Sequence, residues 1–462
     1  MKLNDPLPTL EDGLAAGRAA REGVPRGALA ALGARPDVYD PVARLVWQGQ
    51  RRVASLLPIR YQRMLESPFA FYRGAALLMA EDLARGVSSP FDVQLCGDAH
   101  VANFGVFSSP ERQLVFDVND FDETDPGPFE WDVKRLVASL AIAAEELRLS
   151  GAAQRTVAVE AAREYQRSMR RFAMLPTLDV WYAQLDLSTM VRELRGFFTA
   201  ASSRVADVVL HQAKTKQTRR RFEEMLTYAD DGPHIRPLPP VRTTLSDVPD
   251  GSMISRGTLD EVVGAYGATL SGARRALLDQ FTVVDAAHQI VGVGSVGTQC
   301  FIILLVGRDA QDPFFIQVKE AQQSVVSVAR ATASLASHGQ RVVRGQQLMQ
   351  ATPDLFLGWH DMRVGGDDRS FYIRQLYDNK AVIAVNRLDG PRLAAYGRVC
   401  AWTLARAHAR SGARAQIAGY LGSSDRFAEA VADFAMAYLE RNAQDYSSLK
   451  RAAKEGRVTV AR

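Results

Sequence analysis

The chain has 462 residues, of which 47% are hydrophobic and 23% are charged, and its formal net charge is +4. These values are ordinary for a folded globular chain, and they exclude a disordered, collagen-like or rod-like coiled-coil protein. At about 150 residues per domain, the length predicts two to three domain-sized units. The small excess of basic residues does not favour nucleic acid as a partner.

Three cysteines, Cys96, Cys300 and Cys400, lie far apart and offer neither a disulfide framework nor paired zinc ligands. This usage is typical of a reducing compartment. The N-terminal residues include Glu11 and Asp12 and contain no apolar core of a signal peptide. No apolar run reaches the roughly 18 residues that a membrane span needs. We therefore expect a cytoplasmic protein with no membrane partner.

Residues 1–90 are predicted to form an N-terminal helical segment, because apolar residues recur at three- and four-residue spacing over Val46–Leu57 and Phe69–Ala84. Residues 91–228 form the second predicted region. It begins with a short strand at 93–95 and a hairpin with strands at 106–107 and 114–116. Helices are expected to follow over about 131–147 and 152–173.

Residues 229–251 contain five prolines and two glycines, which cannot continue a helix, so we interpret them as a linker or surface loop. Residues 252–385 are predicted to form a strand-rich lobe after a helical stretch near 258–280. The expected strands are 282–286, 290–293, 300–306, 314–318 and 371–376. Residues 386–462 are expected to return as helices, over 392–409 and 424–442, to the helical lobe. This order predicts an α+β fold with two lobes.

Oxygen-bearing side chains are concentrated in two neighbouring stretches. The potential ligands are Asp98, Asn103, Asp117, Asp120, Asp122 and Glu123. Aspartates are poor strand formers and are costly to bury unpaired, so this clustering beside apolar strands indicates a compensating cation or several hydrogen bonds. Carboxylate and amide oxygens suit Mg²⁺, which keeps water and phosphate oxygens as its other ligands. Turn formation and helix capping are the alternative interpretation.

A glycine-rich segment lies between two predicted strands of the second lobe. Its key residues are Gly292, Gly294, Ser295 and Gly297, in the pattern G-x-G-x-x-G. Because a strand rather than a helix follows, the context favours the phosphate-covering loop of a kinase over a dinucleotide-binding turn. Lys319 closes a later apolar strand, where a phosphate-pairing lysine is expected.

The segment Gly97-Asp98-x-His100-x-x-Asn103 resembles the catalytic loop of aminoglycoside-phosphotransferase-like kinases, and Asp98 and Asn103 have the spacing of the protein-kinase loop. The resemblance implies that Asp98 positions or deprotonates a hydroxyl, and that His100 orients Asp98 or contacts phosphate. The later acidic segment resembles the metal-binding element of that family. The following Phe121 favours Asp120 as the main ligand, whereas spacing favours Asp117, and both stay open. Asp122 is expected at a second metal position.

The chain departs from a kinase in its order, because the glycine-rich loop and Lys319 follow the catalytic loop. The fragment Leu404–Ala409, which resembles the helix leading into that loop, also lies near the C-terminus. The resemblance therefore implies a circularly permuted kinase-like fold, with Gln375 at a hinge that meets adenine. Ser324 to Arg341 contains no glutamate, so the usual lysine–glutamate pair lacks a partner. Glu320 is expected on the opposite strand face.

Over most of residues 40–450 the chain resembles a bacterial family known as domain of unknown function 2252. The resemblance is carried by Pro68–Gly74, Gly97–Gly105, Asn119–Glu123 and Gln317–Ala321. This family supplies no established activity. Arg60 and Arg73 flank an aromatic cluster in the first of these stretches. We expect them at the edge of the core, with contact to phosphate or substrate as the alternative.

These observations lead us to expect a phosphotransferase that uses ATP and Mg²⁺ and acts on an unidentified hydroxyl acceptor. The alternative is a nucleotide-binding pseudokinase that acts as a sensor or scaffold, and a metal-dependent phosphoesterase is a third possibility. Phosphoryl and nucleotidyl transfer both fit the same residues. A protein partner and the oligomeric state are not specified by any pattern in the sequence.

Overall fold

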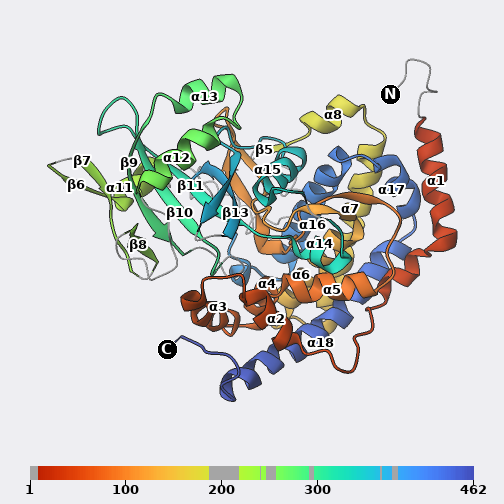
Figure 1. Ribbon diagram of the computed structural model, residues 1–462. Helices are drawn as coiled ribbons and strands as arrows, with labels where there is room; N and C mark the ends of the chain where they lie inside the picture. The colour runs from red at the N-terminus through yellow and green to blue at the C-terminus, as the bar shows by residue number, and fades with distance from the viewer. Residues whose placement is uncertain are drawn as a thin grey trace.

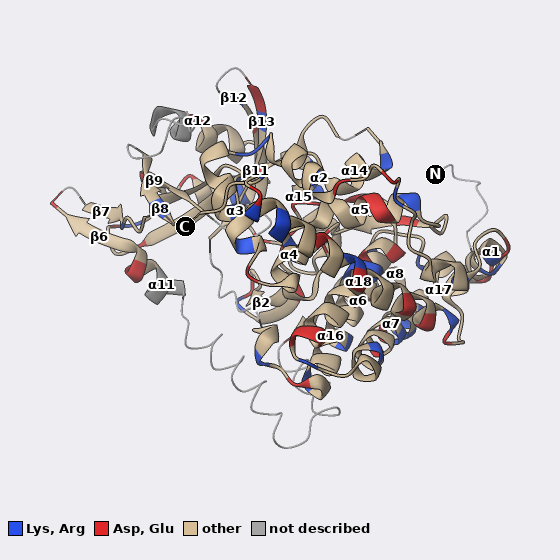
Figure 2. Cartoon of the chain, turned by 90° about the horizontal axis from the view of Figure 1, so that it is seen from below, with Lys and Arg blue, Asp and Glu red and all other residues tan. Residues whose placement is uncertain are grey.

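The computed structural model describes residues 9–186, 218–230, 232–239, 241–245, 256–290, 296–333, 335–364, 367–376 and 383–461. It has a mixed α+β architecture, in which a strand-rich lobe lies beside a larger helical lobe (Figure 1). Both Lys/Arg and Asp/Glu positions are spread over the helices of the larger lobe (Figure 2). No helix among the described residues is both long and apolar enough to cross a bilayer.

The N-terminal region is helical as predicted, but its helices are shorter. They are α1 (Leu10–Gly23), α2 (Pro41–Gly49), α3 (Leu57–Met64), α4 (Pro68–Gly74) and α5 (Ala76–Arg85). The predicted helix over 46–57 ends at Gly49, because the amide of Val53 donates to the carbonyl of Gly297 instead. The predicted helix over 69–84 is broken at Ala75, and the Gly74 carbonyl accepts a hydrogen bond from Arg60.

Two small sheets carry the loops between residues 95 and 125. Strand β1 (Asp92–Leu95) pairs antiparallel with β4 (Asp125–Pro128), and β2 (Phe104–Ser108) pairs with β3 (Leu114–Val118). The short strand β5 (Leu185–Asp186) continues the second sheet. The predicted hairpin is therefore confirmed. The pairing of β1 with β4 brings the loop after β1 next to the loop before β4.

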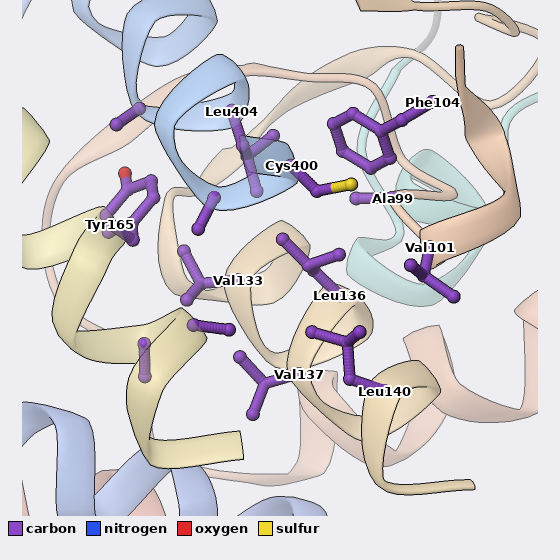
Figure 3. Packing of buried hydrophobic residues seen from close by; sticks show 14 of the residues in the cluster. Ala99, Val101, Phe104, Val133, Leu136, Val137, Leu140, Tyr165, Cys400 and Leu404 are labelled. Atoms are coloured by element: carbon purple, nitrogen blue, oxygen red, sulfur yellow. The ribbon is translucent and has the colours of Figure 1, made fainter. Parts of the chain in front are cut away.

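The helical lobe is built around α6 (Glu130–Glu146), of which residues 130–144 are all buried. Its neighbours are α7 (Gly151–Ala173), α16 (Gly390–Arg410) and α18 (Arg426–Lys454), with α8 (Thr177–Tyr182) and α17 (Arg414–Leu421) at the periphery. Figure 3 shows Leu136 and Leu140 of α6 facing Cys400 of α16 and Val101 of the loop after β1. This core gives that loop a rigid base.

The second lobe contains a six-stranded antiparallel sheet in the order β12-β13-β11-β10-β9-β8. Its strands are β8 (Arg242–Thr244), β9 (Thr282–Gln289), β10 (Cys300–Val306), β11 (Pro313–Ala321), β12 (Gly358–Val364) and β13 (Asp367–Gln375). Its helices are α11 (Thr218–Met225), α12 (Arg256–Gly267), α13 (Gly272–Leu278) and α15 (His338–Met349), whereas α14 (Val325–Arg330) packs on α5 and β4 of the helical lobe. One face of this sheet packs on α12 and α13, and the opposite face packs on α11 and α15.

Three details of this lobe differ from the sequence-based expectations. Strand β9 runs continuously to Gln289, and the described part of the predicted strand 290–293 is not in a strand. No strand was predicted for the residues that form β12. The proline-rich range, interpreted as a linker or loop, contains β7 (Gly232–Ile235), which pairs with β6 (Leu226–Ala229), and also β8. Its prolines are compatible with such short strands at an edge.

Candidate functional site

The loop after β1 is held from below by the first turn of α6. The carboxylate of Asp132 accepts hydrogen bonds from the amides of Cys96 at 2.7 Å and Gly97 at 3.0 Å. Gly97 has a φ of +79°, and a Cβ placed there would lie 2.0 Å from the Glu123 carbonyl oxygen. Only glycine fits this close approach, which fixes the spacing between the two acidic loops.

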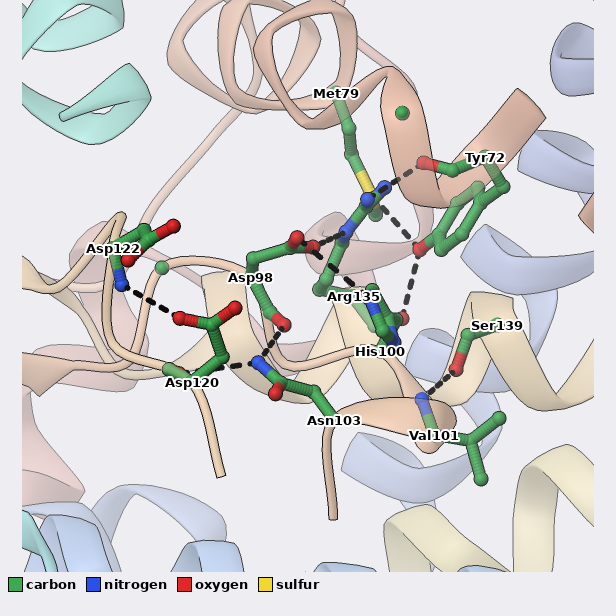
Figure 4. Close-up of polar contacts among 12 residues, drawn as sticks. Tyr72, Met79, Asp98, His100, Val101, Asn103, Asp120, Asp122, Arg135 and Ser139 are labelled. Atoms are coloured by element: carbon green, nitrogen blue, oxygen red, sulfur yellow. Dashed lines mark hydrogen bonds and ion pairs between the residues drawn. The ribbon is translucent and has the colours of Figure 1, made fainter. Parts of the chain in front are cut away.

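Asp98 projects from this loop and is oriented by Arg135 of α6 (Figure 4). The Arg135 Nε donates to Asp98 Oδ1 at 2.9 Å, and its Nη2 donates to the Tyr72 carbonyl at 2.7 Å. Burial raises the pKa of Asp98 above its usual value, while Arg135 acts in the opposite direction. The side chain is still 19% exposed, so the carboxylate is positioned and accessible.

Asn103 joins the two acidic loops through its side-chain amide. Its Nδ2 donates to the carbonyl of Asp98 at 3.0 Å and to that of Asp120 at 3.1 Å. With both protons of Nδ2 used, the amide oxygen is the atom available to a cation. Figure 4 shows Asn103 between these two aspartates.

His100 lies against the same carboxylate, with its Nε2 3.7 Å from Asp98 Oδ2. Burial lowers the pKa of His100 well below its usual value, and the guanidinium groups of Arg73 and Arg135 add to the effect. The imidazole is therefore neutral at physiological pH. It can help to orient Asp98, but it carries no charge for a phosphate.

The acidic loop between β3 and β4 is paired with the end of strand β11. The Lys319 ammonium forms a short ion pair with Asp122 and lies 3.7 Å from Asp120. The Tyr372 hydroxyl, from the neighbouring strand β13, donates to Asp122 Oδ1 at 2.7 Å. Although burial alone would raise it, the pKa of Asp122 is held below its usual value by Lys319. Burial and the charge of Asp122 raise the pKa of Asp120.

These groups surround one cavity of about 240 Å³ between the lobes. Its lining includes the carboxylates of Asp98, Asp120, Asp122, Glu123 and Glu320, the amide of Asn103, and the guanidinium groups of Arg51, Arg52 and Arg73. Thr298, just after the glycine-rich segment, also lines it. The structure therefore brings together five of the six potential ligands, all except Asp117, with Lys319 directly behind Asp120 and Asp122.

Asp117 lies outside this cavity, in the buried contact between β3 and α16. Its Oδ1 forms a short ion pair with Arg406, and its Oδ2 accepts from the Ala351 amide at 3.1 Å. Both side chains of the ion pair are almost fully buried. Asp117 therefore belongs to a buried ion pair that stabilises the fold, whereas the carboxylate of Asp120 is 39% exposed.

Gln375 does not meet the other predicted residues either. Its backbone amide donates to Asp354 Oδ2 at 2.6 Å, and the residue lines a separate cavity of about 440 Å³ beside Gln346 and Phe356. Gly292, Gly294 and Ser295 lie outside the described residues. Gly297 is described, with a φ of +93°, and its carbonyl accepts the hydrogen bond from Val53.

Helix α15 contains no glutamate that could pair with Lys319, and it contributes an arginine to this region instead. Helix α15, which packs on β11 and β13, contributes Arg341 to the acidic loop. The Arg341 guanidinium donates to the carbonyls of Asp122, Gln322 and Thr124. Glu320 instead pairs with Arg369 at 3.0 Å and accepts from the Gln299 amide, which agrees with its expected position on the opposite strand face.

Several residues of the site were not found from the sequence. Arg135 could have been noticed, because it follows Asp132 by three positions and shares its helix face. Tyr372 and Arg341 gave no signal, since their contacts depend on the strand register and on the helix packing of a distant segment. Arg60 and Arg73, both predicted at the edge of the core, have different surroundings in the structure. Arg60 is fully buried against Gln48 and the Gly74 carbonyl, and Arg73 reaches the cavity.

No group of three or more His, Cys, Asp or Glu side chains is arranged as a metal cage within the ranges that the structure describes. Mg²⁺ does not require one, because it is commonly held by one or two carboxylates together with phosphate oxygens. The hard oxygens of Asn103, Asp120 and Asp122 fit such a partial ligand set. When Mg²⁺ and a phosphate group bind there, the Lys319 ammonium would have to leave Asp122 and contact the phosphate instead.

The fold and this cavity define a two-lobed α+β protein with a polar interlobe site, in which carboxylates, an amide and a lysine converge. The chain belongs to the family described as an uncharacterized protein conserved in bacteria, DUF2252, whose model matches residues 52–452. No curated protein and no solved structure matches the chain significantly.

Proposed function

We propose that this protein is a phosphotransferase that uses ATP and Mg²⁺, built on a circularly permuted kinase-like fold. The observation that carries the proposal is the convergence of Asp98, Asn103, Asp120 and Asp122 on one cavity, with Lys319 paired to the last two. Phosphoryl transfer needs positioning and charge stabilisation more than covalent chemistry, and these residue types supply both.

The arrangement of the strand-rich lobe supports the kinase-like part of this proposal. Strands β9, β10 and β11 are consecutive neighbours, the glycine-rich segment connects the first two, and Lys319 lies on the third. Helix α15 then packs against that strand. A glycine-rich loop, a lysine on the third strand and a following helix are the parts that protein kinases use to hold nucleotide phosphates.

The position of α16 supports the permuted order. Its residue His408 lies directly behind the loop of Asp98, with Nε2 3.2 Å from Asp132 Oδ2 and Nδ1 2.8 Å from the Tyr165 hydroxyl. A helix with this sequence normally precedes the catalytic loop in the related kinases. In this chain the helix with that resemblance lies behind the loop of Asp98 although it comes from the C-terminal part of the sequence.

In the proposed reaction each residue has a limited task. Asp98 orients the acceptor hydroxyl and accepts its proton, a role that a carboxylate with a raised pKa performs better. Asn103, Asp120 and Asp122 would hold Mg²⁺, which neutralises charge on the phosphates of ATP. Lys319, buried and charged, would pair with those phosphates. Arg135 keeps Asp98 in position.

A specific observation favours the alternative of a nucleotide-binding pseudokinase. Lys319 is paired with Asp122 and not with a glutamate, and α15 presents Arg341 in that region. In active protein kinases the lysine–glutamate pair must be in place. A protein that binds ATP with Mg²⁺ but transfers no phosphoryl group would therefore correspond to this alternative.

The experiment is to measure release of the γ-phosphoryl group of ATP, with Mg²⁺, by the wild type and by Asp98→Asn. A panel of hydroxyl acceptors and water alone would be offered. We expect Asp98→Asn to lower turnover by about 10²- to 10⁴-fold, the usual contribution of a general base. Its affinity for ATP should be unchanged, because the residue faces the acceptor.

Asp309→Asn, at a fully exposed turn, is the matched control and should retain full turnover. Equal turnover in Asp98→Asn and the wild type would remove Asp98 from the reaction. ATP binding without transfer in every arm would support the pseudokinase.

A further inference from the structure

Arg73 differs from the other buried or half-buried arginines around the cavity. It is the penultimate residue of α4 and half-buried, and it lines the cavity. Within the described ranges it forms no hydrogen bond and no ion pair, and its Nε is buried without a partner. A guanidinium cannot lose its proton in a protein, so this side chain keeps its positive charge beside the cavity without a direct hydrogen-bond or ion-pair partner among the described residues.

The neighbouring arginines, unlike Arg73, each form an ion pair or hydrogen bonds with groups of the protein. Arg135 is held by Asp98 and by the Tyr72 carbonyl, Arg341 binds three carbonyls, and Arg406 is paired with Asp117. Each of these side chains has a structural task. Arg73 has none that would explain why a flexible, charged group is kept beside the cavity, at a cost in solvation.

Arg73 lies close to the acceptor side of the site. Its charge acts on Asp98 and His100, and the carboxylates of Asp98, Glu66 and Asp120 in turn counter the effect of its burial. Arg73 and its cavity neighbours Ala76 and Leu77 come from the N-terminal helices, whereas Asp122 lies on the loop between β3 and β4, with Lys319 of β11 behind it. The donor phosphates already have Lys319 and a cation to neutralise them.

We propose that the acceptor carries an anionic group, a phosphate or a carboxylate, that Arg73 binds beside Asp98. This inference rests on the proposed function, and it names the class of acceptor. An arginine fork matches the oxygens of either group and places them with directional hydrogen bonds. Such a bond fixes the acceptor hydroxyl relative to Asp98, which is the main requirement of the transfer.

The transfer itself is balanced. The acceptor hydroxyl oxygen forms a bond to the γ-phosphorus of ATP, and the bond from that phosphorus to the β–γ bridging oxygen breaks. The electron pair of the broken bond leaves with ADP, and the hydroxyl proton passes to Asp98. Arg73 takes no part in bond making, and is a binding residue for the second anionic group of the acceptor.

The first test measures binding of inorganic phosphate by calorimetry while a non-hydrolysable ATP analogue and Mg²⁺ occupy the donor site. The variants are Arg73→Gln, Arg73→Lys and, as a control, Arg18→Gln at an exposed ion pair on α1. We expect Arg73→Gln to weaken phosphate binding about 10- to 100-fold, as for loss of a charged hydrogen-bonding group. Arg73→Lys should lose less, and Arg18→Gln nothing. Affinity for the ATP analogue should stay within about twofold in all variants.

The second test offers matched acceptors: glycerol, glycerol 3-phosphate and glycerate. Transfer to either anionic compound and not to glycerol would support the proposal, and the preferred one identifies the anion. Equal phosphate binding in Arg73→Gln and the wild type would overturn it, as would competition between phosphate and the ATP analogue, which would place Arg73 at the donor. Preferred transfer to glycerol would also overturn it. If the wild type binds no ATP analogue, the proposed function fails. The dependence of phosphate binding on Arg73 can still be measured on its own.

Discussion

At the scale of single residues, the two candidate metal ligands that the sequence left open have opposite surroundings. Asp117 is buried in an ion pair with Arg406, and Asp120 faces the cavity beside Lys319. Spacing along the chain could not separate them, because the distinction depends on which side of β3 and its following loop reaches the cavity. The loop residues Asp98 and Asn103 were easier to predict, since their contacts are local.

The two aspartates should respond differently to removal of their charge. Asp117→Asn should lower the free energy of unfolding by about 3 kcal/mol, because it leaves the Arg406 guanidinium buried without a counter-charge. Asp120→Asn should change stability by less than about 1 kcal/mol, because its carboxylate is partly exposed and close to Asp122. Urea denaturation measures both values. A larger loss for Asp120→Asn than for Asp117→Asn would contradict these assignments.

At the scale of elements, α15 is the part of the fold that the sequence described least completely. Its lack of glutamate was visible, but its contact with the acidic loop was not, because that contact joins Arg341 to carbonyls about two hundred positions earlier. The lobes were predictable from periodicity and turn residues. The breaks between α2 and α3 and between α4 and α5 were not, since they depend on hydrogen bonds to Gly297 and Arg60.

Helix α15 provides a matched pair of variants. Arg341→Met removes the donors to three buried carbonyls and should lower the free energy of unfolding by about 2 to 4 kcal/mol. It should also weaken Mg²⁺-dependent nucleotide binding, because the loop of Asp120 and Asp122 loses its support. Arg344→Met, at an exposed position one turn away, should do neither. Denaturation and calorimetry together test this, and equal behaviour of the two variants would show that α15 does not support the loop.

At the scale of the whole molecule, helix α1 and the C-terminal end of helix α18 lie on different sides (Figure 1). The N-terminal helices nevertheless pack on the C-terminal helices, because α1 contacts α17, and α2 and α4 contact α18. Ala461 donates to the Pro58 carbonyl, and Arg21 of α1 reaches carbonyls at the end of α17. Such contacts between distant segments have no signature in the sequence.

The buried core of the helical lobe gives the molecule a measurable pH dependence. Burial lowers the pKa of Lys134 to about 8, against the favourable charge of Glu130. Between about pH 8 and 10.5 the unfolded chain binds more protons at this lysine than the folded one, so stability should rise with pH. The full rise is about 3 kcal/mol.

Lys134→Met should remove this rise and stabilise the protein near pH 7, while Ser89 continues to hold Glu130 through two hydrogen bonds. Lys450→Met, at an exposed lysine of α18, should retain the wild-type pH profile. Thermal or urea unfolding at pH 7.5 and 9.5 measures the difference. A parallel profile for Lys134→Met and the wild type would show that folding does not lower the pKa of this lysine.

The most direct measurement of the central claim is calorimetric titration of ATP into the wild type, Lys319→Met and Asp120→Asn, with and without Mg²⁺. The account predicts binding that requires Mg²⁺ in the wild type and that weakens at least about tenfold in both variants, because one site is formed by both lobes. The variant Asp117→Asn, studied where it remains folded, should bind as the wild type does. No binding of ATP at millimolar concentration, or binding that neither variant affects, would contradict the assignment of this cavity to a nucleotide.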